Sequence, residues 1–68
     1  MTGRVVSFDT SRGLGVIEGE DRSRYGFHCT QIADGSRAVS VGAQVFYTVA
    51  PGVLGAWEAT RVAVMSSG

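Results

Sequence analysis

Hydrophobic and polar residues alternate along most of the chain, in short runs separated by turn-forming residues. A period of two is typical of a β-strand with one buried face, because successive side chains point to opposite sides of a sheet. The runs predict strands over Arg4–Phe8, Leu14–Glu18, Arg24–Cys29, Ala43–Val49 and Trp57–Val64. Pro51 is expected to end the fourth run. A short helical turn capped by Thr30 is predicted over Thr30–Ile32.

The alternation also assigns side chains to the two faces of each strand. In the second strand, Leu14 and Val16 share one face, and Gly15 and Ile17 share the other. In the third strand, one side holds Tyr25, Phe27 and Cys29, and the other holds Arg24, Gly26 and His28. We expect Tyr25 and Phe27 in the core. An alternative register, shifted by one residue, would expose Phe27 and turn His28 inward, since such a slip exchanges the faces.

The length of 68 residues leaves room for one hydrophobic core, and the 44% of apolar residues is enough to fill it. An open sheet would leave its edge strands and one face uncovered, whereas closure into a barrel removes most of these edges. We therefore expect an all-β fold, a five-stranded antiparallel OB-fold barrel. The domain is expected over residues 1–64, followed by a flexible tail over residues 65–68.

Charge and composition exclude several functional classes. Six Arg residues balance six acidic ones, which argues against strong non-specific binding to polyanions. Cys29 is the only cysteine, so no internal disulfide forms, and with His28 it supplies too few ligands for zinc. The sequence lacks a Ser/His/Asp arrangement, a phosphate loop and the third glycine of a dinucleotide-binding motif. We expect a protein that is not an enzyme and has no metal or cofactor.

The location of the protein follows by default. No apolar run reaches the length that spans a membrane. The first residues lead directly into a strand pattern and do not resemble a secretory signal. We expect a cytoplasmic protein without a membrane partner.

Five segments, in order, resemble motifs of the bacterial cold-shock proteins, which consist of a single cold-shock domain. Residues 3–9 (GRVVSFD) resemble the opening G-x-V-K-W-F-N, and residues 12–17 (RGLGVI) resemble the first RNA-binding motif, K-G-F-G-F-I. Residues 25–30 (YGFHCT) stand where the second motif, V-F-V-H-F-S, belongs, and Ile32 matches the Ile that follows it. Val41-Gly42 with residues 45–47 (VFY) resemble E-G-Q-x-V-x-F, and Gly55 with residues 58–62 (EATRV) resemble G-P-Q-A-x-N-V. The resemblance covers nearly the whole chain.

The resemblance implies binding to single-stranded RNA or DNA, in which exposed aromatic residues stack on bases and basic residues follow the backbone. Most of these aromatics are replaced here. Ser7 stands in place of the Trp, Val6 of the Lys, Leu14 and Val16 of two Phe, Gly26 and Cys29 of two more, and Ser36 of the loop aromatic. His28 and Arg12 keep their types. The implied binding residues are Ser7, Phe8, Arg12, Leu14, Val16, Phe27, His28 and Arg37.

Several of these residues have two interpretations. Phe8 either stacks on a base or belongs half to the core, and Arg12 and Arg37 either contact phosphate or are ordinary solvated charges. Cys29 is expected to be a small, partly buried hydrophobic residue. Trp57 is expected to cover an end of the barrel.

Two functional hypotheses remain. The first is a weak binder of single-stranded nucleic acid, acting as an RNA chaperone or a regulator of gene expression. The second is a protein–protein or self-association module whose aliphatic patch, formed by Val6, Leu14, Val16 and Cys29, contacts a partner or a second copy in a homodimer.

Overall fold

The computed structural model describes residues 1–33, 35, 38–52 and 57–65. Within these ranges lie five strands and one 3-10 turn: β1 (Thr2–Asp9), β2 (Leu14–Gly19), β3 (Arg24–His28), η1 (Cys29–Gln31), β4 (Gln44–Pro51) and β5 (Trp57–Val64). They close into a barrel in the order β1-β2-β3-β5-β4, with β4 pairing back to β1. The predicted all-β barrel is confirmed, and its topology is consistent with an OB-fold.

The pairing is mixed, so the prediction of a wholly antiparallel barrel is wrong. β3 and β5 run parallel where Gly26 lies opposite Glu58, and the bridge between Ile32 and Val62 is parallel too. The reason is geometric. The ring of described strands has an odd number of members, so direction cannot alternate all the way round. One neighbouring pair has to be parallel.

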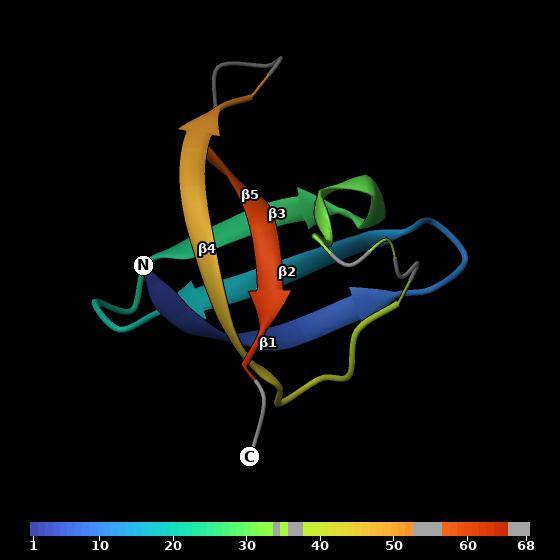
Figure 1. The fold of residues 1–68 in the computed structure, drawn as a ribbon, viewed down its shortest axis with the longest axis horizontal. Coiled ribbons are helices and arrows are strands. Elements are labelled where there is room, and N and C mark those ends of the chain that lie inside the picture. Colours follow the sequence, from blue (N-terminus) through green and yellow to red (C-terminus); the bar gives the residue numbers. More distant parts are fainter. Residues whose placement is uncertain (34, 36–37, 53–56, 66–68) are drawn as a thin grey trace.

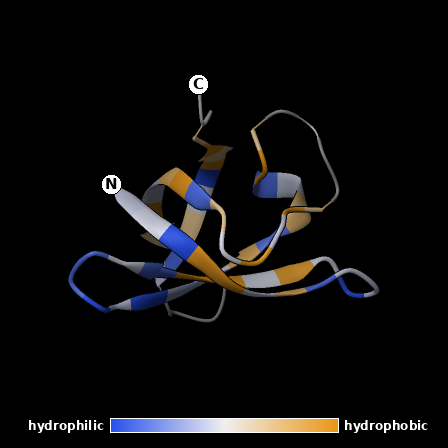
Figure 2. Ribbon diagram, turned by 90° about the horizontal axis from the view of Figure 1, so that it is seen from below, coloured by the Kyte–Doolittle hydropathy of each residue, from blue (hydrophilic) through white to orange (hydrophobic). Residues whose placement is uncertain are grey.

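The core lies between two crossed layers. β1, β2 and β3 run side by side, and β4 and β5 cross in front of them (Figure 1). Figure 2 shows a largely hydrophilic turn between β2 and β3, while the strands carry hydrophobic stretches interrupted by hydrophilic bands. The buried core residues are Val5, Ile17, Phe27, Ile32, Val45, Tyr47, Ala59 and Val62. On β4 the predicted alternation is confirmed, because Val45 and Tyr47 are buried while Phe46 and Thr48 are exposed.

Two β-bulges adjust which side chains reach this core. In β1, Val5 lies opposite Ile17 but Ser7 lies opposite Val16, so Val6 is an extra residue. The bulge turns Ser7 outward and brings the next residue, Phe8, against the core.

The second bulge lies in β5. The register between β4 and β5 shifts between Phe46 and Thr48, opposite a segment that contains Arg61 at φ 51°. This left-handed residue allows Ala59 and Val62, three positions apart, both to be buried. Strict alternation would have placed them on opposite faces.

The register of β3 is the one that buries Phe27, which is 3% exposed, and exposes His28. The alternative register is therefore wrong. β3 ends at His28 and not at Cys29, because the 3-10 turn begins one residue earlier than expected. His28, and not Thr30, caps that turn, since His28 Nδ1 accepts a hydrogen bond from the Thr30 N–H at 3.2 Å.

Some predictions at the strand ends also need correction. β4 continues to Pro51, which pairs with Trp57, and Trp57 is 60% exposed and does not cover an end of the barrel. Met65, expected in the flexible tail, is held to the barrel because its N–H donates to the Gln44 carbonyl at 2.8 Å. The remaining tail residues, 66–68, lie outside the described residues.

Gly15 is a position where the three-stranded layer meets two aromatic rings of the core closely. A Cβ on Gly15 would lie 2.5 Å from Phe27 Cζ and 2.8 Å from Phe8 Cδ1. The two rings stack with their centroids 5.9 Å apart and their planes 23° apart. Neither ring is the flexible end of a long side chain, so a methyl group at Gly15 has no room.

We predict that Gly15→Ala lowers the free energy of unfolding by about 1–3 kcal/mol, because the added methyl group displaces two packed rings. Urea denaturation measures the change. Gly26→Ala on the neighbouring strand is the matched control, since its Cβ would meet only the Gly15 carbonyl oxygen at 3.8 Å. We expect that variant to stay within about 0.5 kcal/mol of the parent. Equal losses in the two variants would contradict the packing described.

Candidate nucleic-acid interface

The outer face of the β1–β2–β3 layer, which points away from β4 and β5, presents three rows of side chains. The strand registers define them. The first row is Asp9, Leu14 and His28; the second is Ser7, Val16 and Gly26; the third is Arg4, Glu18 and Arg24. We call these nine residues the outer face.

Most residues predicted to bind nucleic acid lie on this face or beside it. Ser7, Arg12, Leu14 and His28 are exposed, and Val16 is half-buried. The layer therefore brings together residues from three strands that the sequence separates. Arg37, the remaining predicted basic contact, lies outside the described residues, as does Ser36.

The two phenylalanines of the predicted set do not lie on the outer face. Phe27 is buried, so the structure contradicts its prediction as a base-stacking residue. Phe8 is half-buried, and its ring stacks on that of Phe27. Of its two interpretations, the structure favours the core one. Both rings point inward because Gly15 leaves the space that they fill.

His28 is the one exposed ring on the outer face, and its orientation is fixed. Its Nδ1 accepts the Thr30 N–H and lies 2.9 Å from Thr30 Oγ1. Because Nδ1 acts as an acceptor, the neutral ring holds its proton on Nε2. Cys29 Sγ lies 3.9 Å from the same Nδ1. In the part of the chain that the structure describes, no group of three His, Cys, Asp or Glu residues is placed to hold a metal ion.

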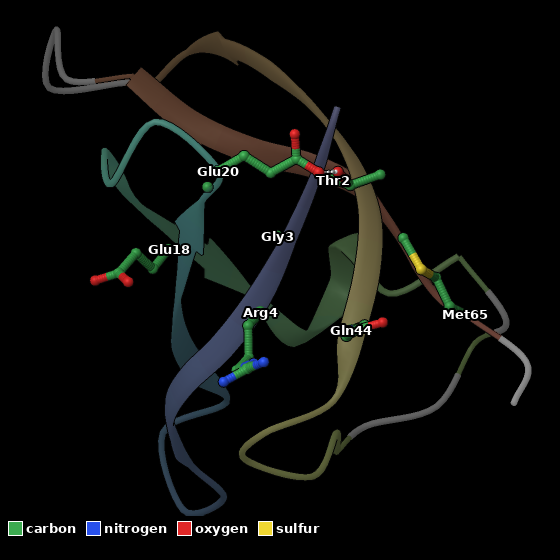
Figure 3. Close-up of a pocket in the computed structure, with 8 residues that line it drawn as sticks. Thr2, Gly3, Arg4, Glu18, Glu20, Gln44 and Met65 are labelled. Carbon is green, nitrogen blue, oxygen red and sulfur yellow. Dashed lines mark hydrogen bonds between the residues drawn. The ribbon is translucent and has the colours of Figure 1, made fainter.

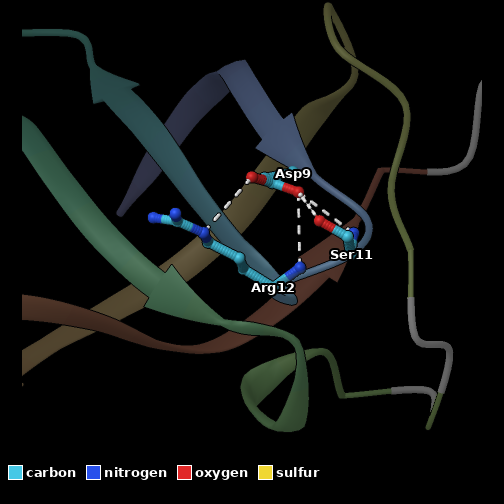
Figure 4. Close-up of polar contacts among 3 residues, drawn as sticks. All are labelled: Asp9, Ser11 and Arg12. Atoms are coloured by element: carbon cyan, nitrogen blue, oxygen red, sulfur yellow. Dashed lines mark hydrogen bonds and ion pairs between the residues drawn. The ribbon is translucent and has the colours of Figure 1, made fainter.

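The turn between β1 and β2 holds Arg12 beside the outer face (Figure 4). Asp9 Oδ1 accepts hydrogen bonds from Ser11 Oγ at 2.7 Å, from the Ser11 N–H at 3.0 Å and from the Arg12 N–H at 3.3 Å. Gly13 closes the turn at φ 67°, and its N–H donates to the Asp9 carbonyl at 2.8 Å. Hydrogen bonds to Asp9 from the residues that follow it therefore hold the turn in this conformation.

The charges of the outer face largely offset one another. Arg12 Nε lies 4.0 Å from Asp9 Oδ2, and Arg24 Nε lies 3.2 Å from Glu18 Oε2. Both pairs are solvent-exposed, so each arginine can exchange its carboxylate for a phosphate at small cost. The neighbouring carboxylates nevertheless weaken the attraction for a polyanion.

A hollow of about 280 Å³ opens at Gly26, lined by Leu14, Gly15, Gly26, Phe27, His28 and Glu58. A Cβ on Gly26 would meet open space apart from one carbonyl oxygen. Gly26 stands where the resembled motif has a phenylalanine, so the sequence alone indicated that a ring is missing at this point. Nothing in the sequence indicated that Glu58 lies here, because the parallel β3–β5 pairing brings it opposite Gly26.

A second hollow, of about 270 Å³, lies around the start of β1 (Figure 3). Its lining includes Arg4, Glu18 and Glu20, and Glu20 accepts a hydrogen bond from Thr2 Oγ1. Two carboxylates against one guanidinium make this hollow unfavourable for phosphate. The nucleic-acid backbone is therefore not expected here.

No protein-family model matches the sequence, and no curated protein matches it. Among the described residues, no helix is long and apolar enough to cross a bilayer.

The hydrogen bonds in the β1–β2 turn lower the pKa of Asp9, with the Ser11 hydroxyl as the largest cause. We predict that Ser11→Ala raises the pKa of Asp9 towards its ordinary value, as followed by NMR titration of the carboxyl group. Ser23→Ala is the matched control, because the equivalent turn places Ser23 on Asp21 and lowers that pKa instead.

The lowered pKa of Asp9 also determines how the stability of the fold changes with pH. The charged Asp9 stabilises the fold above its unfolded pKa, about 3.9, and this contribution is lost as pH falls through the lower folded value. Ser11→Ala should therefore reduce stability at neutral pH more than at acid pH. An unchanged Asp9 pKa in Ser11→Ala would show that the hydroxyl does not hold the turn.

Proposed function

We propose that the chain binds single-stranded RNA or DNA weakly through the outer face, as the cold-shock domains that it resembles do. The observation that supports this most directly is His28. It is an exposed ring of fixed orientation, and it lies in register with the exposed Leu14 on an open strand surface. Every base has a planar face that can stack on such a ring, so this contact does not depend on the base sequence.

The other residues of the interface contribute less to the binding affinity. Leu14 and Val16 give bases apolar contact, Ser7 offers a hydroxyl, and Arg12 reaches a phosphate from the turn. Each aromatic side chain that is missing removes stacking worth about 1–3 kcal/mol per base. The loss of several such partners lowers the affinity by orders of magnitude relative to a complete platform.

The alternative, a protein–protein or homodimer contact through Val6, Leu14, Val16 and Cys29, is less well supported. A protein contact needs a contiguous apolar patch. Leu14 lies between Asp9 and His28 in the register, and Val16 lies between Ser7 and Gly26. Cys29 is half-buried and packs against the core.

The biological role that we expect is that of an RNA chaperone or a regulator of gene expression in the cytoplasm. Weak, sequence-tolerant contacts suit such a role, because the protein has to leave the strand again. This role depends on the same resemblance as the proposed binding.

We predict that oligo-U of about seven nucleotides binds with a Kd between roughly 1 μM and 1 mM. In an NMR titration, the amides of Leu14, Val16 and His28 should shift. The slope of log K against log salt should lie between about −0.7 and −1.4, since one or two phosphates are contacted. Shifts confined to β4, or none at low salt, would contradict the proposal.

Aromatic variants provide the control for this titration. Val16→Phe adds a ring to the outer face and should tighten binding by about 5-fold or more. Phe46→Ala removes a ring that is 53% exposed on β4, outside this face, and should leave the Kd unchanged. Equal affinities of the parent and Val16→Phe would indicate that bases do not lie on this face.

A further inference from the structure

We propose that the hollow at Gly26 accepts one guanine base and that Glu58 recognises its hydrogen-bonding edge. This inference rests on the proposed binding of single-stranded nucleic acid and names the base that it prefers. At about 280 Å³ the hollow lies just below the range of about 300–1,000 Å³ typical of small-molecule sites, which suits a single ring system.

Two glycines create the site. Gly26 leaves the space, because its missing side chain would point into the hollow's open volume. Gly52 places the carboxylate, since a Cβ there would lie 2.5 Å from Glu58 Cδ and 2.6 Å from Glu58 Oε1. The Glu58 side chain therefore lies against the Gly52 backbone while it lines the hollow.

The residues around the hollow make the Glu58 carboxylate the group that distinguishes one base from another. Among the described residues around the hollow, Glu58 alone carries a charge, and Leu14 and Phe27 supply apolar contacts. Among the described residues, neither ion pair involves Glu58. Hydrogen bonds to a charged group are about twice as strong as neutral ones.

The edge that fits a carboxylate is one with two adjacent donors. Guanine has this edge, because its N1–H and N2–H point the same way and can meet both carboxylate oxygens. Uracil and thymine present a single N3–H between two carbonyl groups, which a carboxylate repels. Adenine and cytosine offer one amino donor beside an unprotonated ring nitrogen, which also repels it. Glu58 therefore favours guanine over every other common base.

The test compares oligo-U of about seven nucleotides with the same strand carrying one central guanosine, by calorimetry or fluorescence anisotropy. The parent protein should bind the guanosine strand at least about 10-fold more tightly, the discrimination typical of a bidentate pair. A strand with inosine at that position, which lacks the N2 amino group, should lose most of the gain.

Three variants show which residues cause the preference for the guanosine strand. Glu58→Gln should bring the two strands to within about 2-fold of each other, because one acceptor becomes a donor. Glu20→Gln, which removes an exposed carboxylate outside the hollow, should keep the preference. Gly26→Phe fills the hollow and should abolish the preference for the guanosine strand, while its added ring should tighten the binding of both strands.

Each other outcome overturns a specific claim. If the parent binds both strands equally, the guanine site is wrong and the proposed binding stands. If the preference survives in Glu58→Gln, another residue reads the base and the inference fails. If neither strand binds, the proposed function itself is wrong, and the guanine site falls with it.

Discussion

The contact of two phenylalanine rings with the backbone of Gly15 fixes the arrangement of β1, β2 and β3. Phe8 comes from β1 and Phe27 from β3, and they stack on each other over the strand between them. Any side chain at Gly15 would separate the rings. A one-residue slip of β1 or of β3 would turn Phe8 or Phe27 away from the core. Because strand faces alternate, this inner contact also decides which residues point outward.

The outer face is thus a consequence of the inner packing, but its chemistry is free to differ. Gly15 and Ile17, which belong to the barrel's inner face, match the cold-shock motifs that the sequence resembles. Ser7, Val16 and Gly26, which share one outward row, stand where those motifs have aromatic side chains. A substitution on this row alters ligand contacts at little cost to stability, since none of these side chains belongs to the core. The barrel can therefore form whatever side chains these three positions carry.

The sequence was sufficient for the strands, the burial of Phe27 and the outward position of Leu14, Val16 and His28, because a period of two reports directly on burial. It was insufficient wherever an extra residue breaks that period. The bulges at Val6 and Arg61 depend on cross-strand register, and nothing local in the sequence marks them. The parallel β3–β5 pairing depends on closure of the barrel, so Glu58 could not be placed opposite Gly26 beforehand. Similarly, His28 caps the 3-10 turn through its ring nitrogen, which residue preferences for caps do not anticipate.

The central claim is that the rings of Phe8 and Phe27 cover Gly15 and thereby turn His28 outward. A nuclear Overhauser spectrum of the free protein in solution tests this most directly. The account predicts cross-peaks from the Gly15 Hα protons to ring protons of both phenylalanines, with these Hα resonances shifted by the ring currents. Cross-peaks from the His28 ring to core residues such as Ile17, together with their absence between Gly15 and Phe27, would contradict it.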